Sequence, residues 1–123
     1  MILEGRFWHP QRGLTEGCIE VGDVGNIARV AKTMAGPKER VRGMLLPAAL
    51  DMHVHFRDPG FPRKEDWASG SAAAVCGGVT AVVDMPNTQP PTDSPAAFAD
   101  KARRASAASV VDFGLGVSAR PGI

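Results

Sequence analysis

The second part of the chain repeats one order of elements, and this order restricts the folds available to it. Short runs rich in β-branched residues alternate with alanine-rich stretches, and loops separate them. The predicted strands are 50–55, 79–84 and 109–117, and the predicted helices are 66–76 and 95–107. Strands that alternate with helices at this spacing form βαβ units around a parallel sheet. The fold class predicted from Ala48 onward is therefore α/β.

Punctuating residues support both helix boundaries. Gly77-Gly78 follows the first predicted helix and is a natural C-terminal stop. Ser94-Pro95 opens the second one, with serine as the N-cap and proline at the first helical position. Residues 1–47 have a different texture, with many glycines between short alternating runs such as Cys18-Ile19-Glu20-Val21. This texture predicts a separate segment of small antiparallel strands joined by turns.

The stretch from 50 to 57 alternates strictly between apolar and polar residues. Its apolar positions are Leu50, Met52, Val54 and Phe56, and its polar positions are Asp51, His53, His55 and Arg57. Because side chains alternate across a strand, one face is predicted to pack under helices. Burying the polar face in an apolar core would cost too much free energy, so it is predicted to open on a polar cavity. An α/β barrel has such a cavity at the C-terminal ends of its strands.

His53 and His55 are candidate metal ligands. Two histidines at positions i and i+2 of one strand can bind one ion from the same side, and imidazole nitrogen suits Zn²⁺ and other divalent transition metals. Two ligands do not complete a site, and an isolated H-x-H triplet also occurs by chance, so two unrelated neighbouring histidines are the alternative. His9 has no such partner and is predicted to be a surface or turn histidine.

Asn87 is predicted to follow the second strand of the sheet, at the same end as His53 and His55. Prolines surround it, so one interpretation is a plain turn residue. The other is a substrate-binding role beside Arg57, because an arginine fork and an amide donor together can hold a carboxylate.

Composition excludes several classes of partner. The chain has 123 residues and a formal net charge of +1, which does not favour nucleic-acid binding. Its densest basic cluster, residues 101–104, is predicted to be the solvated face of a helix. No apolar run approaches the roughly 20 residues of a membrane span, and the N-terminus does not resemble a signal peptide. A cytoplasmic location is expected.

The run DMHVHFRDPGFPRKEDWASGSAAAVCGGVTAVVDMPNTQPPTD, residues 51–93, resembles the cyclic amidohydrolases and, within them, dihydroorotase. The motifs that carry the resemblance are H-x-H-x-R-[DE]-P-G, G-S-x-A-A-x-x-G-G-x-T and M-P-N-T-x-P. The resemblance implies the start of a (β/α)₈ TIM-type barrel of the metal-dependent hydrolase kind over 48–123. It also implies a small β-sandwich segment over 1–47.

The resemblance further implies the reversible hydrolysis of L-dihydroorotate to N-carbamoyl-L-aspartate, in de novo pyrimidine (UMP) synthesis. His53 and His55 would bind metal, as one or two zinc ions or another divalent metal. Arg57 and Asn87 would bind the carboxylate of this small-molecule substrate. The alternatives are another cyclic amidohydrolase, of the allantoinase or hydantoinase type, and a non-catalytic dihydroorotase-like interaction subunit.

The chain is shorter than a (β/α)₈ domain, which takes about 250 residues. In the relatives that the resemblance implies, the other metal ligands and the catalytic aspartate lie beyond the position of Ile123. No catalytic residue is therefore assigned within the chain. We expect a fragment that is inactive alone, with a natural short product as the alternative. A homo-oligomer or a transcarbamoylase partner is also expected.

Overall fold

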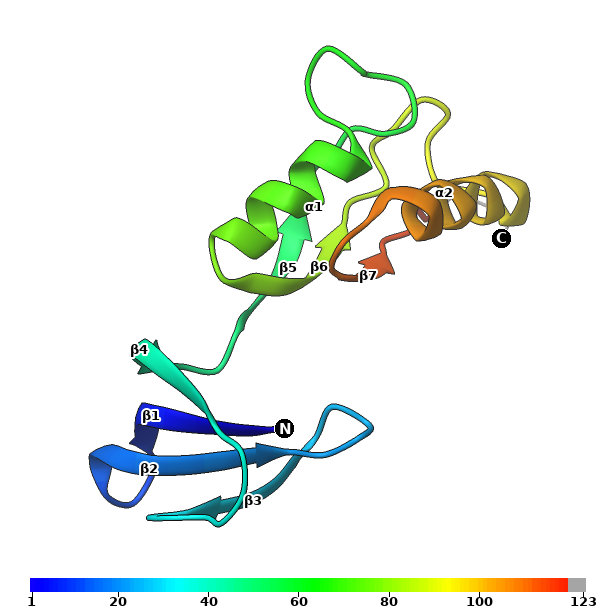
Figure 1. Cartoon of the computed structure of the whole chain (residues 1–123). Helices are drawn as coiled ribbons and strands as arrows, with labels where there is room; N and C mark the ends of the chain where they lie inside the picture. The colour runs from blue at the N-terminus through cyan, green and yellow to red at the C-terminus, as the bar shows by residue number, and fades with distance from the viewer. Residues whose placement is uncertain (120–123) are drawn as a thin grey trace. The chain divides into compact units, whose positions relative to one another are not determined.

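The computed structural model describes residues 1–119, which form two compact units (Figure 1). The first unit comprises residues 1–47, and the second begins at Ala48. Within the described residues no helix is long and apolar enough to cross a bilayer.

The first unit is one four-stranded sheet in the order β3-β2-β1-β4. Its strands are β1 (Ile2–His9), β2 (Gly13–Val21), β3 (Ile27–Ala31) and β4 (Glu39–Leu45). β1 with β2 and β2 with β3 pair antiparallel, as predicted, but β4 lies parallel to β1. The prediction of antiparallel strands was wrong for β4, because residues 32–38 lead the chain back to the start of β1, opposite Leu3, in place of a tight hairpin. Residues 1–47 thus supply one sheet layer.

His9 ends β1 at the tip of the first hairpin. Its backbone oxygen accepts a hydrogen bond from the Arg12 N–H (3.2 Å), and its Nδ1 accepts one from the Gln11 N–H (3.2 Å). Gly13 completes the turn with a φ of +70°, which glycine adopts without steric cost. His9 is therefore a turn histidine, as predicted.

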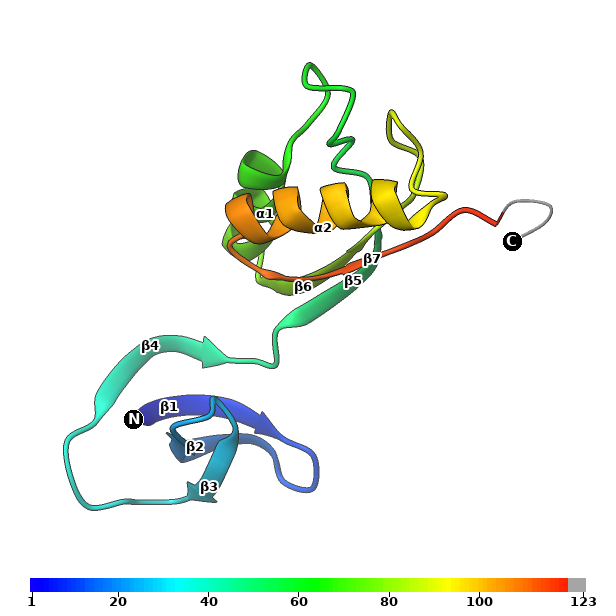
Figure 2. The same ribbon diagram turned by 90° about the vertical axis from the view of Figure 1, so that its right-hand side faces the viewer.

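The second unit is a three-stranded parallel sheet in the order β5-β6-β7, with both helices on one side of it (Figure 2). Its elements are β5 (Ala49–Val54), α1 (Trp67–Cys76), β6 (Val79–Asp84), α2 (Pro95–Ala108) and β7 (Asp112–Leu115). The predicted βαβαβ order is confirmed. β7 is shorter than predicted at its start because Ser109 caps α2 and its hydroxyl donates to the Val111 carbonyl oxygen (2.8 Å).

Ser94 caps the start of α2 as predicted, and Asp66 caps the start of α1 in the same way. The Asp66 side chain accepts a hydrogen bond from the Ser69 N–H (2.8 Å) at the start of α1. The Ser94 hydroxyl oxygen accepts one from the Ala97 N–H (3.3 Å) at the start of α2. These side chains satisfy backbone donors that have no partner within the helix. Gly78, with a φ of +83°, turns the chain from α1 into β6.

Phe56, Trp67, Val82 and Ala105 form the core between the sheet and the helices. Trp67 is fully buried and meets the Phe56 ring edge to face, with the centroids 5.0 Å apart. Aromatic pairs favour this arrangement, which adds about 0.5–1.5 kcal/mol beyond the area that they bury. The core therefore fixes Phe56, the residue between His55 and Arg57.

An irregularity in β5 interrupts the predicted alternation. Asp51 pairs with Val82 and Val54 pairs with Asp84, so three steps along β5 match two along β6. Val82 and Asp84 are both buried beneath the helices. Residues three apart in a regular strand point to opposite faces of the sheet. Here the extra residue pairs Asp51 and Val54 with Val82 and Asp84, which share one face of β6.

The prediction that all four apolar residues of this stretch pack under helices was therefore wrong for two of them. Leu50 and Met52 are each 66% exposed, whereas Val54 is half-buried and Phe56 is buried. The Asp51 carboxylate is turned back onto its own strand, where it accepts a hydrogen bond from the His53 N–H (3.1 Å). The Asp51 carboxylate therefore does not join the His53 and His55 side chains in the polar face that strict alternation predicted.

Candidate functional site

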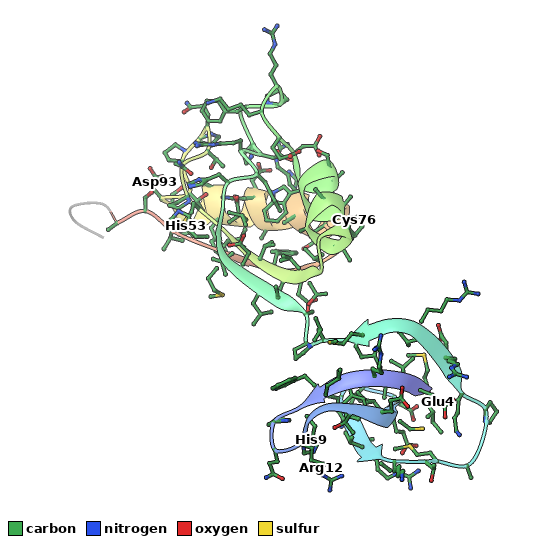
Figure 3. The ribbon with its side chains drawn as sticks, turned by 90° about the vertical axis from the view of Figure 1, so that its left-hand side faces the viewer. Glu4, His9, Arg12, His53, Cys76 and Asp93 are labelled. Carbon is green, nitrogen blue, oxygen red and sulfur yellow. The ribbon has the colours of Figure 1, made fainter. Side chains whose placement is uncertain are left out.

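The candidate site residues lie where β5 and β6 end. His53 is the second-last residue of β5, and His55 and Arg57 come just after the strand. Asn87 is in the loop after β6. Because parallel strands end at the same edge of a sheet, these segments of distant sequence meet there. Figure 3 shows His53 toward one end of the second unit and Cys76, the last residue of α1, toward the other.

The two histidine side chains converge. Their Nε2 atoms are 3.2 Å apart, and the rings meet at an interplanar angle of 65° with centroids 5.0 Å apart. Both residues are exposed, so the pair is accessible from solvent.

Asn87 contacts His55 on the other side of its ring. The His55 Nδ1 atom is 2.8 Å from the Asn87 Oδ1 atom. An amide oxygen only accepts hydrogen bonds, so this contact requires the proton of neutral His55 on Nδ1. The lone pair is then on Nε2, the atom that faces His53. A metal-binding histidine commonly has its second nitrogen fixed in this way.

The histidine pair fits part of a zinc site. Two nitrogens that bind one zinc ion tetrahedrally at about 2.0–2.1 Å lie roughly 3.3–3.4 Å apart. The observed 3.2 Å between the Nε2 atoms is close to this separation. Within residues 1–119, however, no group of three or more His, Cys, Asp and Glu side chains is placed to hold an ion. The pair therefore has the spacing of two ligands of such a site.

Arg57 lies in the loop after β5 and contacts the loop after β6. Its φ is +62°, in the left-handed region that residues other than glycine seldom adopt. Its Nη1 atom donates to the Asn87 backbone oxygen (3.4 Å). The structure therefore brings together all four residues predicted for the site: His53, His55, Arg57 and Asn87.

The two loops that carry Arg57 and Asn87 are also joined through their backbones. The Gln89 N–H donates to the Pro59 carbonyl oxygen (3.0 Å). Gly60, with a φ of +110°, lies so close to Gln89 that a Cβ atom there would be 2.5 Å from the Gln89 oxygen. Only a residue without a side chain allows this approach.

The sequence interpretation missed one buried ion pair next to the site. Lys101, in α2, was predicted to be solvated with its basic neighbours, but it is fully buried. Its Nζ atom is 2.6 Å from the Oδ2 atom of Asp84, which is also fully buried. The helix periodicity could have found this, because Lys101 lies four residues before the buried Ala105 on the same face.

The neighbouring charges of α2 behave as predicted. Arg103 and Arg104 are exposed and pair with Asp100, and the hydrogen bond from Arg104 holds the pKa of the Asp100 carboxyl below its usual value. Arg104 also lies 3.9 Å from Asp58, in the loop after β5. Exposed pairs of this kind contribute little to stability.

Proteins of known activity resemble this chain. It is 59% identical to a dihydroorotase from Halobacterium salinarum over 71 residues, which cover 58% of this chain and 17% of that protein. It is 39% identical to a dihydroorotase from Archaeoglobus fulgidus over 117 residues, which cover 95% of this chain and 28% of that protein. The chain therefore spans less than a third of the length of these relatives.

A solved structure resembles the fold. The L-hydantoinase (dihydropyrimidinase) from Arthrobacter aurescens aligns with a TM-score of 0.82 and 29% identity, over 98% of this chain and 28% of that one. Residues 44–120, more than half of the chain, match the profile of the Amidohydrolase family. This segment contains all four site residues and both βαβ units. The chain belongs to the amidohydrolase family.

Proposed function

We propose that this chain supplies the first part of a dihydroorotase, which hydrolyses L-dihydroorotate reversibly to N-carbamoyl-L-aspartate. The observation that carries the proposal is the convergence of two imidazoles, an amide and a guanidinium at one end of the sheet. The similarity to curated dihydroorotases supports it. In this role β5, β6 and β7 are the first three strands of a (β/α)₈ barrel, and residues 1–47 contribute to a β-sandwich.

In the proposed site His53 and His55 hold a divalent metal ion, with zinc as the first candidate. Such an ion, when bound, supplies Lewis-acid polarisation of the ring carbonyl oxygen. Asn87 keeps the His55 proton on Nδ1 through its Oδ1 atom, and this leaves its NH₂ group free to donate to a substrate. The remaining ligands and the group that moves the proton come from residues outside those described.

Arg57 and Asn87 bind the substrate carboxylate in this proposal. The guanidinium presents a planar set of donors that matches a carboxylate, and the bond from Nη1 to the Asn87 oxygen holds the two residues side by side. A carboxylate distinguishes dihydroorotate from hydantoin and from other neutral cyclic amides. The proposed role of the pair is therefore specificity. The reaction itself adds water across the ring amide, breaks the C–N bond and returns a proton to the nitrogen.

A hydantoinase-type activity is the second candidate, because the similarity to the Arthrobacter aurescens structure extends over nearly the whole chain. The biological setting that we propose is pyrimidine synthesis in the cytoplasm. A homo-oligomer or a transcarbamoylase partner stays a prediction.

The test uses the whole enzyme of which this chain is proposed to be the first part, called the full-length protein below. It compares ring opening of dihydroorotate, hydantoin and allantoin. Dihydroorotate is expected to be the preferred substrate. Arg57→Met is expected to raise KM for dihydroorotate about 10- to 100-fold, since a hydrogen bond to a charged group is lost. Arg12→Met, at the exposed tip of the first hairpin, is the matched control. Preference for hydantoin, or an unchanged KM in Arg57→Met, would sink the proposal.

A further inference from the structure

Asp84 and Lys101 form a fully buried ion pair directly beneath the candidate site. Asp84 is the last residue of β6, and Lys101 reaches it from α2, with 2.6 Å between Oδ2 and Nζ. Removing two charges from water costs free energy that their attraction only partly returns, so a buried pair is weak evidence for a stabilising role. Its other bonds indicate a different role.

Each member of the pair also forms a hydrogen bond with a backbone atom of a site segment. The Asp84 Oδ1 atom accepts a hydrogen bond from the Phe56 N–H (2.7 Å). Lys101 Nζ donates to the Met85 carbonyl oxygen (2.8 Å). Phe56 lies between His55 and Arg57, and Met85 lies two residues before Asn87. One ion pair thus connects the two segments that carry the site.

We propose that Asp84 and Lys101 are positioning residues, which hold the segment from His55 to Arg57 at a fixed place relative to the segment that carries Asn87. The consequence for substrate binding rests on the proposed function. The positioning itself rests only on the bonds within the chain.

The backbone at Arg57 explains why such a device is needed. Its φ of +62° is unfavourable for a residue with a side chain, so surrounding contacts must maintain it. The peptide just before Arg57 is held by the core through the Phe56 ring and by Asp84 through the Phe56 N–H. An apolar pair of equal volume could fill the space of Asp84 and Lys101, but it could not bind the Phe56 N–H or the Met85 oxygen.

Two double variants of the full-length protein separate positioning from packing. Asp84→Leu with Lys101→Met removes both charges and the acceptor for the Phe56 N–H. Asp84→Asn with Lys101→Met also removes both charges but keeps an oxygen at that place. Neither variant leaves an unpaired buried charge, so both are expected to fold.

Hydrogen exchange at the Phe56 amide and the kinetics with dihydroorotate are the two readouts. The leucine variant is expected to exchange the Phe56 amide about two- to tenfold faster than the asparagine variant, since a hydrogen bond between neutral groups is worth about that factor. It is also expected to show a higher KM, with a smaller change in kcat. Equal exchange in the two variants would overturn the proposal.

The parent protein gives a check that requires no variant to fold. Its Phe56 amide is expected to be strongly protected, and exchange at the rate of a free amide would overturn the proposal. If the parent does not hydrolyse dihydroorotate but the two variants still differ in Phe56 exchange, the proposed function fails and the positioning role stands. If hydrolysis is found and exchange does not differ, only the positioning role fails.

Discussion

Replacing Gly60 with alanine would push apart the two loops that carry Arg57 and Asn87. The new Cβ atom would lie 2.5 Å from both Cβ and O of Gln89 and 2.8 Å from its N. Two of these atoms are backbone, so no side-chain rotation relieves the contact. The loops would have to separate, and the bond from the Gln89 N–H to the Pro59 oxygen would be lost.

The cost has three possible contributions. An alanine at a φ of +110° carries backbone strain of about 1–3 kcal/mol. The overpacking adds about 1–3 kcal/mol, and the lost hydrogen bond adds about 0.5–1.5 kcal/mol. We therefore expect Gly60→Ala to destabilise the second unit by roughly 2–6 kcal/mol if the loops stay in place, and by roughly 1.5–4.5 kcal/mol if they separate and lose the hydrogen bond.

Gly36→Ala is the matched control. Gly36 has a similar φ of +101°, but no atom lies within 4 Å of a Cβ built there. The Gly36→Ala variant therefore carries the backbone strain but no overpacking. Gly36 also belongs to the first unit, whereas both site loops belong to the second.

The assay combines thermal unfolding of the two variants with hydrogen exchange at the Gln89 amide. Gly60→Ala is expected to show the larger loss of stability, fast exchange at Gln89 and a raised KM for dihydroorotate. Gly36→Ala is expected to keep the Gln89 amide protected and KM unchanged. Equal losses of stability, with Gln89 protected in both, would refute the argument that the Gly60 contact joins the loops.

Three further outcomes are expected. Gly70→Ala gains about 1 kcal/mol of helix propensity but places a Cβ atom 2.6 Å from the buried Phe56 ring, so a net loss of about 1–2 kcal/mol is expected in urea unfolding. Hydrogen bonds from Ser69, in the first turn of α1, lower the pKa of Asp66. The stability that the Asp66 carboxylate adds to the folded state is therefore complete above its unfolded pKa, and it is lost as pH falls through the lower folded pKa. Asp66→Asn should therefore lose less stability than the parent on acidification below about pH 4, and equal acid sensitivity would contradict this. Removing metal with a chelator should lower the thermal midpoint of the parent but not of a His53→Ala/His55→Ala variant, since a ligand stabilises only the state that binds it.

Signals from neighbouring residues were sufficient to predict the order and type of the helices and strands in the second unit. Ser94 before Pro95 and the pair Gly77-Gly78 place helix ends through backbone hydrogen bonding and permitted dihedral angles, which depend on near neighbours in sequence. The start of β7 was missed because Ser109 belongs to the cap of α2, and a cap and a strand start have the same extended backbone.

Contacts between distant residues could not be predicted in the same way. The burial of Lys101 depends on Asp84, 17 positions earlier, and a lysine beside two arginines reads as a solvated cluster when that carboxylate is not considered. The parallel pairing of β4 with β1 is likewise set by where a connection returns, not by the residues of either strand. The meeting of His55 with Asn87 was predicted as a shared end of the sheet, but the bond between Nδ1 and Oδ1 required coordinates.

The extra residue in β5 separates the strand into two segments that can change independently. Before it, Leu50 and Asp51 pair with Ala81 and Val82 in regular register, and after it Val54 pairs with Asp84, so that His53 lies within the irregular stretch itself. We expect a small shift in the first segment to be absorbed at the irregularity before it reaches His55. We therefore expect the end of the strand that carries the candidate metal ligands to tolerate substitutions upstream better than the end of a regular strand would.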